Sequence, residues 1–178
     1  MGARALYMMD CGVGEFDYGI LVAMQHPGEK VLSPFSACLI DTDDGPVLVE
    51  TGVNPDGRRD PAAAAGERAR AGRLSLRDGD GEVVPGVWVI SSPGHTPGHQ
   101  SVLVSLPESG KMLLALDAIS TRENIELETV GGVPWNAALA IGSIRRLVQL
   151  VKRENATLVP GHQPGCWSTL KRSPECYR

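Results

Sequence analysis

The sequence has no dense run of basic residues and no long apolar run. Its 178 residues carry 17 Lys and Arg against 21 Asp and Glu, for a net charge of -4. The basic residues are scattered, and the closest groups are short pairs such as Arg145-Arg146 and Lys152-Arg153. Nucleic acid is therefore excluded as a main partner, because phosphate binding needs clustered Lys and Arg. No stretch approaches the roughly 20 apolar residues of a membrane span, so no membrane partner is expected.

The N-terminus and the cysteines also lack features of exported proteins. The first residues do not contain the apolar stretch of about 7–15 residues found in a signal peptide. The four cysteines show no Cys-x-x-Cys spacing, which argues against a zinc knuckle or a redox pair. The sequence therefore predicts a cytoplasmic protein with free thiols. A catalytic cysteine paired with a distant histidine stays open.

Aromatic residues are scarce, at 4%, whereas glycine (21) and proline (13) are frequent. This composition predicts many turns between short strands. No repeat or low-complexity linker divides the chain, so a single domain over residues 1–178 is expected.

Short apolar segments separated by turn residues predict the strands. Residues 32–42 and 46–52 flank Asp43-Asp44-Gly45 and form a predicted hairpin. Further strands are predicted at residues 86–92, 101–106, 111–116 and 156–159.

One helix is clear, at residues 136–154. Its apolar residues repeat at helical spacing and form one stripe, namely Ala140, Ile144, Leu147, Val148 and Val151. Residues 54–80 hold little apolar surface, which favours a surface loop or a short helix.

Three metal-capable side chains follow predicted strand ends: His95, Asp117 and His162. Each lies beside a glycine or a small residue that allows a sharp turn, and strand ends are common positions for functional groups. Two imidazoles and a carboxylate suit zinc or a similar divalent ion. Taken singly, each has a structural explanation, such as a surface histidine or a capping aspartate. Together they raise the hypothesis of a metal site.

The other two histidines are interpreted as structural. His99 lies four residues after His95, and in a loop this spacing does not place both rings on one metal. We expect His99 to have a structural role or to orient the metal ligands without binding the metal itself. His26, in Gln-His-Pro-Gly, is a predicted turn residue.

Several segments resemble metallo-β-lactamase-fold hydrolases. Pro93–His99 reads Pro-Gly-His-Thr-Pro-Gly-His, like a loop of that family. Val49–Gly52 resembles its early Val-Asp-Thr-Gly strand end, with Glu50 in place of Asp. Leu114–Ala118 is similar to the strand that carries a bridging aspartate, and Pro160–His162 to the last histidine loop.

Other segments resemble a narrower branch, the quorum-quenching N-acyl-homoserine lactone lactonases. These segments are Leu6–Gly12, Asp80–Val87 and Thr121–Asn124. The resemblance implies an α/β fold, the metallo-β-lactamase-like αββα four-layer sandwich with two mixed sheets face to face, shortened in its first half. It implies ring-opening hydrolysis of a small lactone substrate to a hydroxy acid.

The resemblance also assigns roles to site residues. His95 would ligate one metal, His162 a second, and Asp117 would bridge them, with His99 and Glu50 supporting the ligands. Zinc or another divalent ion would then bind the attacking hydroxide, because metals lower the pKa of bound water. An apolar groove for the acyl chain would be lined by Ile20, Leu21, Met24 and Trp135.

The sequence departs from this family at its defining signature, His-x-His-x-Asp-His, which is absent. All four histidines lie elsewhere. Segments that the family keeps well apart meet near residues 70–73, which indicates an internal deletion, either real, engineered, or due to an omitted segment. With the signature gone, one metal or none is expected, held weakly by His95, Asp117 and His162. Ser120 stands where many of these lactonases have a tyrosine, so its help to the oxyanion would be weak.

Three interpretations of function stay open. The first is the lactone hydrolase, and the second is a related hydrolase acting on an ester, thioester or phosphodiester. The third is a catalytically impaired remnant of the fold that binds a partner or a ligand, which the missing signature favours for the chain as it stands. Loss of part of the first half would expose a sheet edge or apolar surface, so a homodimer is also a hypothesis.

Overall fold

The computed structural model describes residues 2–50 and 77–178. The inferred deletion near residues 70–73, and most of the predicted loop at 54–80, lie outside these residues. The described strands form two sheets, one of three strands in the order β1-β2-β3 and one of five in the order β4-β5-β6-β7-β8.

The three-stranded sheet contains the predicted hairpin. β1 (Ala3–Asp17) pairs antiparallel with β2 (Lys30–Thr42), and β2 pairs antiparallel with β3 (Val47–Val49). The hairpin is confirmed, and its second strand ends at Val49 among the described residues, whereas Thr51 and Gly52 of the predicted strand lie outside them. Glu50 ends it, because its φ of 59° is incompatible with an extended strand.

The five-stranded sheet carries the strand ends of interest. Its members are β4 (Gly81–Val84), β5 (Val87–Ser91), β6 (Gln100–Leu106), β7 (Gly110–Leu116) and β8 (Thr157–Pro160). β4 to β7 are antiparallel neighbours, whereas β7 and β8 run parallel. The expected mixture of strand directions is therefore found in this sheet, while all the described pairs of the other sheet are antiparallel.

α5 (Ala137–Glu154) confirms the predicted helix. Asn136 caps its first turn through a side-chain bond from the amide of Leu139, and Asn155 ends it in a left-handed conformation. The buried stripe is shifted from the predicted one. Its members are Ala140, Ser143, Ile144, Leu147 and Leu150, whereas Val148 and Val151 are only partly buried. None of the described helices is long and apolar enough to cross a membrane.

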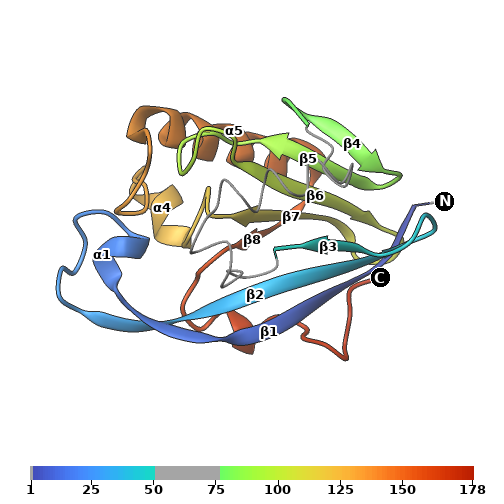
Figure 1. Cartoon of the computed structure of the whole chain (residues 1–178), viewed down its shortest axis with the longest axis horizontal. Coiled ribbons are helices and arrows are strands. Elements are labelled where there is room, and N and C mark those ends of the chain that lie inside the picture. The colour runs from blue at the N-terminus through green and yellow to red at the C-terminus, as the bar shows by residue number, and fades with distance from the viewer. Residues whose placement is uncertain (1, 51–76) are drawn as a thin grey trace, which may run out of the picture.

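Two apolar cores define the layers seen in Figure 1. The first lies between the sheets and joins Leu6, Met8 and Ile40 to residues of β5, β6 and β7 such as Val104 and Met112. The second lies between the five-stranded sheet and α5, and includes Leu103, Leu113, Ile144 and Leu147. The alternation of side chains along β6 and β7 supplies both cores, because successive residues face opposite sides of a sheet.

Two short helices that the sequence did not predict close one end of the sandwich. α1 (Tyr18–Leu21) follows β1, and α4 (Arg122–Glu126) follows β7. The fully buried Asn124 amide donates to the carbonyl of Leu21 at 3.0 Å, so the two helices are tied together. A turn of 3-10 helix, Cys166–Ser168, follows β8. Helices of this length leave no periodic signal in a sequence.

Gly94 permits a close approach of the loop after β5 to the start of α5. Its φ is 142°, and an added Cβ would overlap the backbone of Ala140. The carbonyl of Gly94 accepts from the amide of Asn136 at 3.0 Å. The backbone at this point therefore requires glycine.

Replacing this glycine should destabilise the fold. We expect Gly94→Ala to lower the free energy of unfolding by about 2–4 kcal/mol, because the clash is with backbone and cannot be relieved by a rotamer change. Gly98→Ala is the matched control, since no heavy atom lies within 4 Å of its Cβ position. Urea denaturation of both variants measures the difference, and equal midpoints would refute this account of Gly94.

Candidate active site

The structure brings His95, Asp117 and His162 together at one end of the five-stranded sheet. His95 follows β5, Asp117 follows β7 directly, and His162 follows β8. One oxygen of the Asp117 carboxylate lies 2.8 Å from His162 Nε2, and the other lies 3.5 Å from His95 Nε2. The carboxylate is therefore placed between two imidazoles.

The loops after β7 and β8 are locked together by their backbones. Leu116 has a φ of 53°, and an added Cβ on Gly161 would collide with its carbonyl oxygen. The amide of Gly161 donates to the carbonyl of Ile119, and the amide of His162 donates to that of Ser120, each at 2.9 Å. This contact fixes His162 beside Asp117.

The other sheet holds His162 from behind. The fully buried hydroxyl of Ser33, in β2, donates to the His162 carbonyl at 3.1 Å, and His162 Nδ1 lies 3.3 Å from the carbonyl oxygen of Pro34. The rings of Phe16 and Phe35 each lie 6.5 Å from the imidazole. The position of His162 therefore depends on the packing of the two sheets.

The charges of this group reinforce one another. The hydrogen bond from His162 lowers the pKa of Asp117 below its usual value, although burial opposes the shift. The same bond raises the pKa of His162, again against burial. An anionic carboxylate and a protonated imidazole are thus stabilised together.

His99 and Glu50 lie around this group in different ways. Nδ1 of His99 contacts the hydroxyl of Ser92 at 2.8 Å, and burial lowers the pKa of His99. Its ring centroid lies 6.1 Å from that of His95. Glu50 is an exposed residue, but its carboxyl group is partly shielded from water. This desolvation is the main cause that raises the pKa of Glu50, and the negative charge of Asp117 raises it further. The predicted supporting residues are both near the group, but the described contacts include no hydrogen bond from either to Asp117.

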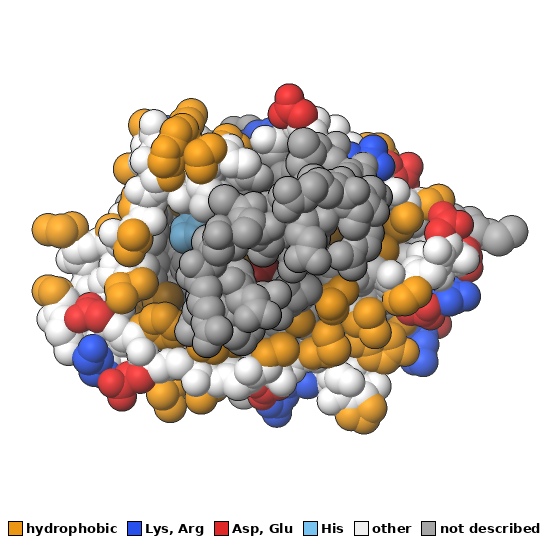
Figure 2. Space-filling model, in the orientation of Figure 1, with side chains coloured by type: hydrophobic (Ala, Val, Ile, Leu, Met, Phe, Trp, Pro, Cys, Tyr) orange, Lys and Arg blue, Asp and Glu red, His pale blue; other side chains and the backbone are white. Residues whose placement is uncertain are grey.

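A largely apolar pocket of about 110 Å³ opens beside these polar groups. Of the four residues predicted to line an acyl groove, Ile20 and Leu21 line it. Met24 and Trp135 do not, and they are 91% and 58% exposed. Ser120 lines the pocket and is 9% exposed. Figure 2 shows histidine surface on this face of the molecule, with apolar side chains near it.

Several other lining residues were not predicted from the sequence, namely Phe16, Val130, Gly131, Val133 and Pro134. One signal was available, because consecutive glycines often mark a close backbone approach. An added Cβ on Gly132 would collide with the carbonyl oxygen of Gly19, and the amide of Gly132 donates to the carbonyl of Ile20. The glycines thus hold α1 against the loop that completes the pocket.

The donor types at the site suit zinc, but the described residues do not complete a metal centre. Within residues 2–50 and 77–178, no group of three or more His, Cys, Asp or Glu side chains is arranged to hold an ion. Asp117 has both oxygens directed at imidazoles, and a catalytic zinc normally takes three protein ligands with an open position. Two metal ions would need more ligands than His95, Asp117 and His162 provide.

The Asp117–His162 pair predicts a pH-dependent contribution to stability in the metal-free protein. The lowered pKa of Asp117 gives stabilisation that is present above its unfolded value of 3.8 and is lost as pH falls through the folded value. The raised pKa of His162 gives stabilisation that is present below 6.5 and is lost as pH rises through the folded value. Asp117→Asn should therefore destabilise more at pH 5.5 than at pH 9. Denaturant melts in chelator would show this, and an equal loss at both pH values would contradict the ion pair.

Known proteins with related sequences are N-acyl homoserine lactonases, although no family model matches the chain. The lactonase of a Bacillus species is 47% identical over 85 residues, which are 48% of this chain and 34% of that protein. The lactonase AttM of Rhizobium radiobacter is 37% identical over 99 residues, which are 56% of this chain and 36% of that protein. The matched part therefore spans about a third of the length of these relatives.

Solved structures extend the likeness over the whole chain. A quorum-quenching N-acyl homoserine lactone lactonase superposes with a TM-score of 0.83 at 25% identity, covering 99% of both chains. A mutant of AiiA from B. thuringiensis, with N-decanoyl-L-homoserine at its active site, gives 0.84 at 25% identity and covers 99% of this chain and 100% of that one. A probable metal-dependent hydrolase from Staphylococcus aureus, at 12% identity and a TM-score of 0.67, covers 89% of this chain and 88% of that one and shares the fold alone. This chain thus has the metallo-β-lactamase-like α/β fold, and in sequence it resembles the N-acyl homoserine lactonases.

Proposed function

We propose that this chain is a hydrolase that opens the ring of N-acyl-homoserine lactones, and that its activity is weak as the chain stands. One observation carries the proposal: Asp117 lies between His95 and His162 at the polar end of an apolar pocket. A related lactonase structure holds the product N-hexanoyl-L-homoserine at a catalytic metal center. An amphiphilic lactone matches a pocket with one polar and one apolar end.

The described residues can bind the substrate and move a proton. Leu21, Val130 and Phe16 offer apolar surface to an acyl chain. His95 Nε2 contacts Asp117 Oδ2 at 3.5 Å, so this imidazole can accept a proton from an attacking water while Asp117 stabilises the imidazolium. The ring oxygen leaves as the hydroxyl of the product and takes up a proton. Ser120 has too short a side chain to contribute much to the developing oxyanion.

A divalent ion would be held weakly in this proposal. Zinc is the expected ion, because imidazole and carboxylate are among its usual ligands. With His95, Asp117 and His162 as the ligands that the described residues offer, we propose one ion or fewer per chain. The zinc sites of hydrolases lower the pKa of bound water, and that is the chemistry a complete site would add.

A second candidate function is binding without turnover. The missing His-x-His-x-Asp-His signature and the incomplete donor set among the described residues favour it. Calorimetric binding of N-hexanoyl-L-homoserine, with no ring opening of the matching lactone, would select this function over hydrolysis. A panel of esters and thioesters would separate lactone hydrolysis from that of related substrates.

Ring opening tests the proposal directly. We expect N-hexanoyl-homoserine lactone to be opened above the spontaneous rate in the presence of zinc, cobalt or manganese. Asp117→Asn should lower kcat/KM by at least about 100-fold, because it removes the partner of both imidazoles. Ser120→Ala should lower it by less than about threefold and serves as the control from the same pocket. Release of the hydroxy acid, followed by chromatography, gives the rates. No turnover with any metal, or equal losses in the two variants, would reject the hydrolase.

The cellular and oligomeric setting is also a proposal. We infer a cytoplasmic protein, since all four cysteines are free thiols. We infer a homodimer, because β3 is an edge strand of its sheet among the described strands and Leu48 within it is 51% exposed. Light scattering at micromolar concentration should give twice the chain mass of 18.9 kDa. A Leu48→Lys variant should be monomeric, and a monomeric mass for the unmodified chain would reject the dimer.

A further inference from the structure

A second cavity, separate from the candidate active site, lies between α5 and the outer face of the five-stranded sheet. Its volume is about 370 Å³, which falls in the range of small-molecule pockets, roughly 300–1,000 Å³. The pocket beside Asp117 is smaller, at about 110 Å³. None of the residues that line the larger cavity lines the smaller one.

α5 forms one wall of this groove, and strands form its floor. Arg146, Gln149, Leu150 and Arg153 line it from the helix, and their spacing of three and four places them on one helix face. Trp88, Ile90 and Leu103 line it from β5 and β6. Ile90 and Leu103 are buried at the bottom, whereas Trp88 is 41% exposed.

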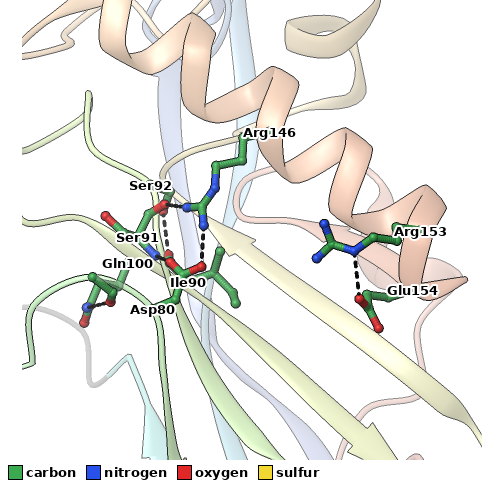
Figure 3. A network of polar contacts seen from close by, with 9 residues as sticks. Asp80, Ile90, Ser91, Ser92, Gln100, Arg146, Arg153 and Glu154 are labelled. Atoms are coloured by element: carbon green, nitrogen blue, oxygen red, sulfur yellow. Dashed lines mark hydrogen bonds and ion pairs between the residues drawn. The ribbon is translucent and has the colours of Figure 1, made fainter.

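The charged side chains at the two ends of the groove are paired differently. At one end both terminal nitrogens of Arg146 donate, Nη1 to the carbonyl of Ser91 at 2.5 Å and Nη2 to the carboxylate of Asp80. Figure 3 shows this network and, further along α5, the pair formed by Arg153 and Glu154. Asp80 also accepts a hydrogen bond from the backbone amide of Ser91, so the charged groups at this end are paired within the protein.

At the other end, two cations share one carboxylate. Lys111 Nζ lies 2.6 Å from one oxygen of Glu154, and Arg153 Nε lies 3.0 Å from the other. One carboxylate therefore pairs with two cationic side chains. This end of the groove carries an excess positive charge, although the net charge of the chain is -4. Lys111 keeps ammonium donors and Arg153 keeps both terminal guanidinium nitrogens for a further acceptor, since the described contacts use one donor of each.

We propose that this groove binds an aromatic carboxylate, with its ring against Trp88 and its carboxylate on the donors that Lys111 and Arg153 do not use for Glu154. The apolar floor and the indole provide the surface for a flat ring, and the shared Glu154 holds the two cations close to each other. The proposal concerns a different surface from the lactone site and does not depend on it.

Nuclear magnetic resonance with 2-naphthoate tests the site on the full chain. We expect binding in the range of about 0.1–1 mM for a ligand of this size. The indole N–H signal of Trp88 should shift with saturation, together with amides of β5, β6 and α5. The indole signal of Trp135 should not shift, because the amide of Trp135 bonds to His95 and reports on the candidate active site. No saturable shift at Trp88, or a larger shift at Trp135, would overturn the proposal.

A matched pair of variants tests the role of charge. Arg153 and Arg145 both lie on α5, are 71% and 60% exposed, and each pairs with a glutamate. Only Arg153 lines the groove. Arg153→Gln should weaken 2-naphthoate binding by about three- to fivefold, the size expected for one exposed ion pair, and Arg145→Gln should leave it unchanged. The neutral analogue 2-naphthalenemethanol should bind more weakly than 2-naphthoate to the unmodified chain. Equal affinity in both variants, or equal binding of the neutral analogue, would refute carboxylate recognition.

Discussion

The parallel contact between β7 and β8 is the constraint on which the site depends. It places the loops after both strands at the same edge, where Gly161 approaches the backbone of Leu116 so closely that no side chain fits. His162 then reaches Asp117, and the hydrogen bond between them shifts both pKa values toward the charged forms. Ser33, in β2 of the other sheet, donates a hydrogen bond to the carbonyl of His162. The geometry of the site therefore depends on how the two sheets pack.

Much of the fold could be predicted because its elements leave strong local signals. Asp43-Asp44-Gly45 between two apolar runs predicted the hairpin of β2 and β3, and apolar residues at helical spacing predicted α5. The short helices α1 and α4 could not be predicted, since four or five residues show no period. The buried stripe of α5 differs from the predicted one because Leu150 and Ser143 face the sheet. Ser143 is small, and its hydroxyl donates to the carbonyl of Pro93. Tertiary packing, and not the local sequence pattern, decides which of these residues are buried.

The site was predictable in its residues but not in its surroundings. Strand ends beside a glycine or a small residue pointed to His95, Asp117 and His162, and the structure places these three side chains together. The aromatic rings beside His162 and the loop of Val130 to Pro134 come from distant parts of the chain, and only the three-dimensional fold brings them to the pocket. The His-x-His-x-Asp-His segment is absent from the sequence. His95, Asp117 and His162 are fewer side chains than a two-metal centre needs.

Metal content per chain tests the central claim most directly. Purified protein should be dialysed without chelator, and zinc, cobalt, manganese and iron measured by mass spectrometry together with the protein concentration. We predict at most one metal ion per chain, because the described strand ends bring together His95, Asp117 and His162, which are too few ligands for two ions. Tightly held metal at two ions per chain would contradict the account, since it would require ligands beyond these three and a complete centre.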